Sequence, residues 1–218
     1  MKYTCVMPWM IWDWRWACLE TCKIDVCDID NSMVNRGVSR SWNMGIDEMN
    51  RTDSDWLIVM SAAIRFGDAG GLDFVQLLED HSDHGVVSAL GTYGWHLIAF
   101  SRETIEAAGR FDENFFPGYY EDIDYAIRMH HTQSTRLWGA YDCDVTDAGM
   151  GHTMRKLKLP IDNESLLTYF ISKWQVNPGC DWHQYAEHPF LNKNNPMGYW
   201  PQSPHTGGVW DQPASEAL

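Results

Sequence analysis

The sequence lacks the short motifs that mark the commonest nucleotide-binding and hydrolytic sites. No GxGxxG follows the first predicted strand and no GxxxxGK[ST] occurs, so the usual dinucleotide and P-loop phosphate cradles are excluded. HExxH and GxSxG are also missing, which excludes the metalloproteases and hydrolases that carry them. What remains is an acidic motif at the head of a predicted helix.

Basic residues and long apolar runs are scarce as well. Sixteen Lys and Arg stand against 30 Asp and Glu, a formal net charge of −14, and no basic run would attract a nucleic acid backbone. The apolar run from Trp56 to Ile64 falls far short of the roughly twenty residues that cross a bilayer. The first residues show no signal-peptide pattern. We therefore expect a cytoplasmic protein, in the host cytoplasm if it is viral, that does not contact a membrane.

Cysteine pairs with the spacing of a metal site are lacking too. None of the six cysteines forms a CxxC pair. Cys18 and Cys22 share one face of a predicted helix and Cys27 follows in a predicted strand, an arrangement that would allow a zinc cluster. Reduced, buried thiols are the more ordinary state of such residues. A zinc-stabilised structural protein stays open as a minor alternative.

The sequence is rich in tryptophan and has the composition of a folded domain. The chain has 218 residues, of which 44% are apolar and 21% charged, which fits one domain with room for a small second unit. Its 12 Trp residues supply core contacts and also flat surfaces on which sugars and bases stack.

Strand and helix patterns alternate over the first two thirds of the chain. Strands are predicted at 4–11, 23–30, 55–62, 86–90 and 95–101, and helices at 13–22, 39–49, 71–81, 101–109 and 121–131. Ser101 is the predicted N-cap of the fourth helix and Gly109 its end. The alternation favours an α/β sandwich with a mainly parallel central sheet, whose ligands bind beyond the carboxyl ends of the strands. We expect one domain at 1–176 and an aromatic, loop-rich extension at 177–218 packed on it.

The acidic motif is GRFDENFFPGYYEDIDYAIR, from Gly109 to Arg128. Its acids Glu121, Asp122 and Asp124 follow an aromatic loop. A carboxylate held at the edge of a cleft can take a proton from a sugar hydroxyl. Acids in a first helical turn also stabilise the helix dipole. The motif by itself leaves both interpretations open.

Several segments, in order, resemble the inverting glycosyltransferases of the large family two, which have the GT-A fold. The acidic motif is similar to their FDExFF...EDxDLxxR signature. VCDIDNS at 26–32 resembles their VVDNxS element, NRGVSRSWNMGI at 35–46 their NxGxxxxxNxGI element, and DWLIVMSAAIRF at 55–66 the strand with their DxD-type metal motif. TYFISKW at 168–174 is similar to a stretch of some phage-type members. The resemblance covers roughly Lys2 to Lys173.

The resemblance implies a catalytic role for the acids. Asp122 would be the general base that deprotonates the acceptor hydroxyl, with inversion at the anomeric carbon. Glu121 and Asp124 would orient the acceptor and secure the helix. On the donor side, Asp28 and Asp30 would contact uracil and ribose.

Other matching positions are implied to bind the nucleotide. Asn35 and Gly37 would shape the nucleotide pocket. His152 stands where the family often has a histidine that reaches the metal or the diphosphate, although an isolated histidine in a Gly-rich turn is often an ordinary surface residue. Arg155 and Lys156 would neutralise the charge of the departing diphosphate.

Two residues of the strand before the acidic loop match the region where the family meets sugar and acceptor. These are Trp95 and His96. Trp95 would stack on a sugar face, although a tryptophan is more often part of the core.

The metal motif departs from the family pattern. Ser61, Ala62 and Ala63 stand where acids are usual, and alanine cannot ligate a hard divalent cation. A Mn²⁺ or Mg²⁺ cofactor is therefore doubtful, and Ser61 and Ala63 are expected to line the nucleotide-sugar site only. Three outcomes are open: a metal held by His152, a neighbouring acid and the diphosphate; replacement of the metal by cations such as Arg65, Arg155 or Lys156; or loss of turnover.

We therefore expect an enzyme that moves one hexose or pentose from a nucleoside diphosphate sugar, first of all a UDP sugar, to a hydroxyl group. The phage-like segments suggest a virion protein, a surface glycan or a modified DNA base as acceptor, and the net charge counts against DNA. The alternative is a degenerate glycosyltransferase that binds nucleotide or glycan without catalysis.

Overall fold

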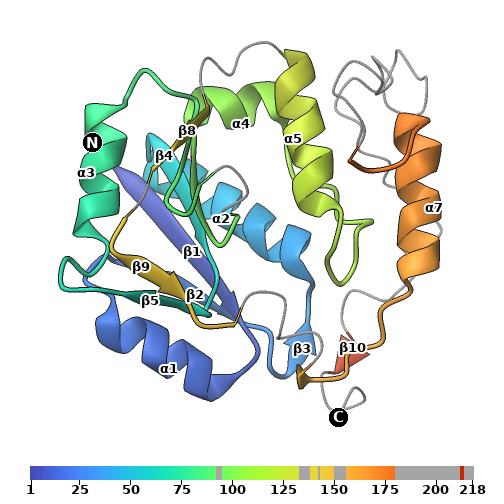
Figure 1. Cartoon of the computed structure of the whole chain (residues 1–218), viewed down its shortest axis with the longest axis horizontal. Helices are drawn as coiled ribbons and strands as arrows, with labels where there is room; N and C mark the ends of the chain where they lie inside the picture. Colours follow the sequence, from blue (N-terminus) through green and yellow to red (C-terminus); the bar gives the residue numbers. More distant parts are fainter. Residues whose placement is uncertain (92–94, 133–137, 142, 150–155, 180–211, 214–218) are drawn as a thin grey trace.

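The computed structural model describes residues 1–91, 95–132, 138–141, 143–149, 156–179 and 212–213. Their centre is a six-stranded sheet in the order β2-β1-β4-β7-β6-β8 (Figure 1). The strands are β1 (Tyr3–Trp9), β2 (Cys27–Asp30), β4 (Trp56–Met60), β6 (Val86–Ser88), β7 (Leu97–Ser101) and β8 (Trp138–Ala140). Only β7 runs antiparallel to its neighbours β4 and β6; the other adjacent pairs are parallel. The mainly parallel α/β sheet predicted from the sequence is confirmed.

Helices cover both faces of this sheet because its central strands are apolar on both sides. All five residues of β4 are buried. Side chains on one face of β1 and β4 pack against α1 (Trp12–Thr21) and α3 (Leu72–Asp80). Alternate side chains, such as Val6 and Val59, pack against α2 (Val38–Thr52), α4 (Arg102–Ala108) and α5 (Glu121–Thr132).

Several predicted boundaries agree closely with the structure. Ser101 Oγ accepts a hydrogen bond of 3.2 Å from the backbone N of Thr104, so it caps α4 as predicted. The helix ends at Gly109, where φ is +79°. The second strand, predicted over 23–30, is confined to β2 at 27–30.

Short strands outside the central sheet were not predicted. β5 (Ile64–Phe66) pairs antiparallel with β9 (Val145–Asp147), and β3 (Val34–Asn35) pairs antiparallel with β10 (Gln212–Pro213). Each has only two or three residues, too few for a period-two pattern to show. The predicted extension at 177–218 lies mostly outside the described residues.

An unpredicted helix, α7 (Asn163–Trp174), packs along α5 through buried charged groups (Figure 1). Lys173 Nζ donates a hydrogen bond to Asp112 Oδ2 at 2.7 Å and forms an ion pair with Asp124 Oδ1 at 2.5 Å. Asp124 also accepts from Arg128 Nε at 3.1 Å and from Trp174 Nε1 at 2.9 Å. These bonds satisfy charges that would be costly to bury alone, and they hold α5 in place.

The zinc cluster considered for Cys18, Cys22 and Cys27 is not formed. Cys18 is buried, Cys22 partly buried and Cys27 exposed, and all three are free thiols. Among the described residues no group of three or more His, Cys, Asp or Glu side chains is placed to hold a metal ion. Burial raises the pKa of Cys18 to about 12, which keeps this thiol protonated.

Within the described residues, every helix is too short or too polar to cross a bilayer.

Candidate functional site

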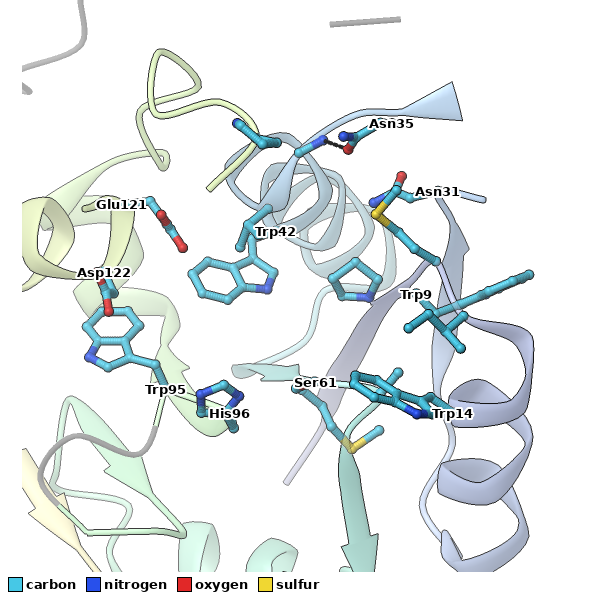
Figure 2. A pocket seen from close by; sticks show the side chains of 18 residues that line it. Trp9, Trp14, Asn31, Asn35, Trp42, Ser61, Trp95, His96, Glu121 and Asp122 are labelled. Carbon is cyan, nitrogen blue, oxygen red and sulfur yellow. Dashed lines mark hydrogen bonds between the residues drawn. The ribbon is translucent and has the colours of Figure 1, made fainter. Parts of the chain in front are cut away.

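A cavity of about 210 Å³ opens where the central parallel strands end (Figure 2). Trp9 ends β1, Asn31 follows β2, and Ser61 follows β4; all three line the cavity. Because β7 runs the opposite way, the residues before it, Trp95 and His96, reach the same edge of the sheet. The cavity thus lies where the α/β pattern predicts a ligand site.

One wall of the cavity is built by Asn35, the last residue of β3, and by Gly37, which directly precedes α2. Asn35 Oδ1 accepts a hydrogen bond of 3.0 Å from the backbone N of Gly37 (Figure 2). Gly37 has φ +74°, and a Cβ there would lie 2.9 Å from Phe116 Cδ2. Val38 N donates to the carbonyl oxygen of Pro117 at 2.9 Å. Glycine therefore allows the loop before α5 to contact this wall directly.

Four tryptophans line the cavity: Trp9, Trp14, Trp42 and Trp95. Trp42 and Trp95 are stacked, with ring centroids 6.2 Å apart and an interplanar angle of 20°. Trp14 carries a cation at its face, because Lys156 Nζ lies 5.2 Å from its ring centroid. The cavity thus offers flat apolar surfaces with a positive charge close to one of them.

Glu121 and Asp122 bring two carboxyl groups to the side of the cavity that lies opposite Trp9 and Trp14 (Figure 2). Glu121 is 8% exposed, and its Oε2 is a buried acceptor without a hydrogen-bond partner in the described structure. Burial raises the pKa of Glu121 well above its ordinary value, and the charge of Asp122 adds to this. Burial also raises the pKa of Asp122, but backbone hydrogen bonds and His96 counteract the rise. Burial thus raises the pKa of both carboxyl groups, and that of Glu121 the more strongly.

His96 lies between acids of two different elements. Burial lowers its pKa, whereas the charges of Asp147 and Asp122 oppose that shift. Its Nδ1 is 3.9 Å from Asp147 Oδ2. Its carbonyl oxygen accepts from the backbone N of Ser61 at 2.8 Å, which fixes His96 beside the end of β4.

A buried asparagine of α2 connects the two walls. Asn43, 1% exposed, donates to the carbonyl oxygen of Phe111 at 2.9 Å and to Glu113 Oε1 at 2.8 Å. Its Oδ1 accepts from Phe111 N at 2.8 Å. The helix that carries Trp42 into the cavity is therefore bonded to the loop that leads to α5.

The structure brings together seven of the residues predicted for the site. The cavity is lined by Asn35, Gly37, Ser61, Trp95, His96, Glu121 and Asp122.

Other predicted residues do not line the cavity. Asp124 is 0% exposed and bound within the α5–α7 contacts, so it secures the helix and is not in position to touch an acceptor. Ala63 is buried beside the cavity. Asp30 Oδ1 accepts from Ser32 N at 2.7 Å, and Asp28 accepts from Trp9 Nε1 at 3.0 Å and from Arg15. Asp28 thus contacts Trp9, which lines the cavity, but does not line the cavity itself.

Two predicted residues, His152 and Arg155, lie outside the described residues. Sequence reasoning missed Asn31, Trp14, Trp42 and Asp147. Asn31 could have been predicted, because it belongs to the VCDIDNS segment at 26–32. Asp147 carries no local signal, since only the pairing of β9 with β5 brings it near the site.

No protein-family model and no curated protein matches the sequence. Among solved structures, the mannosyltransferase PcManGT from Pyrobaculum calidifontis, in complex with GDP-Man and Mn²⁺, is similar with a TM-score of 0.50 at 13% identity, over 72% of this chain and 60% of that one.

Two other solved structures are more distant. TarS from S. aureus has a TM-score of 0.39 at 8% identity, over 65% of this chain and 60% of that one. A protein from STIV has a TM-score of 0.38 at 14% identity, over 49% of this chain and 68% of that one. The chain thus spans about 60% of the length of PcManGT and of TarS. The comparison with PcManGT shows that this chain has a glycosyltransferase-like fold of the GT-A type.

Proposed function

We propose that the chain is an inverting glycosyltransferase that moves one sugar from a nucleoside diphosphate sugar to an acceptor hydroxyl. The observation that carries this proposal is the position of Asp122, a carboxyl group with a raised pKa, in the cavity at the carboxyl ends of the strands. Asn31 and Asn35, which belong to the segments that resemble the family's nucleotide-binding elements, line the same cavity. The fold shared with a mannosyltransferase supports the same reaction class.

In the proposed reaction Asp122 takes the proton of the acceptor hydroxyl while its oxygen attacks the anomeric carbon. The bond from that carbon to the diphosphate breaks, the diphosphate leaves with the electron pair, and the configuration inverts. Glu121, held protonated by burial, donates a hydrogen bond to a hydroxyl of the sugar or acceptor. The stacked Trp42 and Trp95 provide the apolar surface against which a sugar ring lies.

The segment from Ser61 to Ala63 does not fit the metal site of the resembling family. The side chains of Ala62 and Ala63 have no atom that could ligate a metal ion, and Ser61 Oγ accepts from Ala63 N at 3.2 Å. Arg65 donates to the carbonyl oxygens of Ala62 and Ile64, so it braces this turn. The proposed reaction therefore has no step through a metal at this segment. Lys156, at the face of Trp14, is the cation that we place against the diphosphate.

The donor and acceptor are proposed at the level of chemical class. A UDP sugar is the first donor to test, with GDP and TDP sugars beside it. A virion protein, a surface glycan or a modified DNA base would supply the acceptor hydroxyl, and the net charge of −14 disfavours DNA.

The test is release of nucleoside diphosphate from a panel of UDP, GDP and TDP sugars, with and without Mn²⁺. We expect slow hydrolysis of one donor, reduced about 10²- to 10⁴-fold in Asp122→Asn. Asp80→Asn, an exposed acid at the end of α3, is the matched control and should keep the wild-type rate. Nucleotide binding without release under any condition would instead support the degenerate binding module.

A further inference from the structure

Among the described residues that line the cavity, His96 is the one whose side chain can carry a positive charge. Lys156 lies at the face of Trp14 and does not itself line the cavity. Arg65 is turned to the carbonyl oxygens of Ala62 and Ile64. An anion that enters the cavity therefore meets His96 as the cationic group of the described lining.

The sheet holds His96 at the end of β4. The carbonyl oxygen of His96 accepts from the backbone N of Ser61 at 2.8 Å, and the next residue, Leu97, pairs with Met60. Figure 2 shows the imidazole ring pointing into the cavity. The ring thus lies beside the turn in which the resembling family has metal-binding acids and this chain has none.

Two carboxyl groups from different elements act on the His96 ring. Asp147 Oδ2, on β9, is buried without a hydrogen-bond partner in the described structure and lies 3.9 Å from His96 Nδ1. Asp122, on α5, lines the cavity with His96. Burial lowers the pKa of His96, and the charges of Asp147 and Asp122 oppose that shift. A bound anion would add a third negative charge and draw a proton onto the ring.

We propose that His96 is a further catalytic residue, an imidazolium ion that contacts the donor diphosphate and stabilises the charge of the departing group. This inference rests on the proposed function. As the bond between sugar and diphosphate breaks, the diphosphate oxygen keeps the electron pair and accepts a hydrogen bond from His96. The ring forms no covalent bond. Asp147, which does not line the cavity, is the positioning residue that favours the charged ring from behind.

The test is the binding of UDP and GDP in EDTA, followed by quenching of tryptophan fluorescence from about pH 5 to about pH 8. We expect wild-type affinity to be highest in acid and to fall about tenfold as pH rises, because a proton is taken up with the diphosphate. His96→Gln should bind more weakly in acid and keep only the pH dependence of the nucleotide phosphate itself. Uridine, which has no phosphate, should bind equally to both proteins.

Asp147→Asn tests the positioning role. Asp147 Oδ1 accepts from Gly149 N at 2.9 Å, a bond that asparagine can keep, so the variant removes mainly the charge. Its fall in affinity should occur at lower pH than in the wild type, because His96 loses a negative neighbour. His84→Gln is the matched control: His84 Nδ1 lies 3.0 Å from Asp83 Oδ1, away from the cavity lining, and the variant should follow the wild-type curve. Thermal melting checks the fold, and His96→Asn replaces His96→Gln if that variant is unstable.

Inorganic pyrophosphate, titrated in parallel, separates this inference from the proposed function. UDP or GDP binding with the same affinity and pH dependence in wild type and His96→Gln overturns the role of His96 and leaves the proposed function standing. Pyrophosphate binding that depends on His96, without any binding of UDP or GDP, supports the contact with the diphosphate group and counts against the proposed function. Binding of neither overturns both. In the hydrolysis assay His96→Gln should release diphosphate about 10²-fold more slowly, and an unchanged rate overturns its catalytic role.

Discussion

Lys173 donates a 2.7 Å hydrogen bond to Asp112, and both side chains are at most 1% exposed. Burial would raise the pKa of Asp112, but the ammonium group of Lys173 and its hydrogen bond bring that pKa below its ordinary value. Lys173 reaches Asp124 as well, so one cation on α7 compensates two buried acids. The position of α5, and with it the acids in its first turn, depends on this cation.

Lys173→Met is expected to destabilise the protein by about 3 to 5 kcal/mol, because it leaves the buried Asp112 without its cation and removes one of the two cations beside Asp124. Chemical denaturation with urea measures the loss. Lys2→Met is the matched control: Lys2 is 66% exposed and lies 3.8 Å from Asp53, so its loss should cost about 1 kcal/mol or less. Equal stabilities of the two variants would show that the buried contacts contribute little.

Glu121→Gln is expected to stabilise the protein at neutral pH by roughly 1 to 3 kcal/mol, because Glu121, with its raised pKa, has to take up a proton on folding and glutamine does not. Since the pKa of Glu121 is raised in the folded state, its favourable contribution is complete below the ordinary value of 4.5 and is lost as pH rises through the folded pKa. The melting temperature of the variant should therefore equal that of the wild type at acidic pH and exceed it at higher pH.

The measurement is the melting temperature from pH 4 to pH 8. Glu103→Gln, an exposed acid in the first turn of α4, is the control and should follow the wild-type curve. If the melting temperature of Glu121→Gln also followed the wild-type curve over this pH range, burial would not raise the pKa of the Glu121 carboxyl group.

Gly37→Ala is expected to lower stability more than Gly91→Ala and to weaken nucleotide binding. Both glycines have φ +74°, so the backbone strain of roughly 1 to 2 kcal/mol is shared. Only at Gly37 does the new Cβ meet neighbours, at 2.9 Å from Phe116 and 3.2 Å from Pro117 O. Urea unfolding and fluorescence titration with UDP and GDP compare the two variants, and equal effects would contradict a role for this contact in the cavity wall.

Lys156→Gln is expected to weaken the binding of UDP or GDP about two- to fivefold, since an exposed cation contributes modestly. The difference should shrink in high salt, where exposed charges are screened. Lys158→Gln, a nearby exposed lysine, serves as control. If both variants lost the same affinity for UDP or GDP, the effect would come from the overall charge of the protein and not from the position of Lys156 beside Trp14.

Five of the six strands of the main sheet and the helices on its faces were predictable because their signals are local, whereas the three-residue strand β8 was not predicted. β4 is a continuous apolar run, and α4 has its cap and its terminal glycine within nine residues of each other. The direction of β7 was not predictable, because an antiparallel strand has the same apolar pattern as a parallel one. The antiparallel β7 nevertheless brings Trp95 and His96 to the ligand edge that the sequence prediction gave them.

The candidate site was predictable only where its residues belong to a motif. Asp122 and Asn35 were found through such motifs, and both line the cavity. Asp124 belongs to the same motif as Asp122, but the helical period places its side chain on the buried face of α5. There it contacts Lys173, about fifty residues later in the chain. Asp147 depends on a ladder of three residues whose partner strand lies far back in the chain. Contacts between distant segments of this kind leave no pattern in either segment.

Asn43 gives the cavity a property that its lining residues do not have by themselves. Because this side chain bonds α2 to the loop before α5, the spacing between Trp42 and the acids is set before any ligand arrives. A substrate then has little free energy to spend on bringing the two sides together, which is the advantage of a preorganised receptor. Substitutions of the residues that line the cavity could therefore change which ligand binds. The distance between Trp42 and the acids would still be set by the amide group of Asn43, which does not line the cavity.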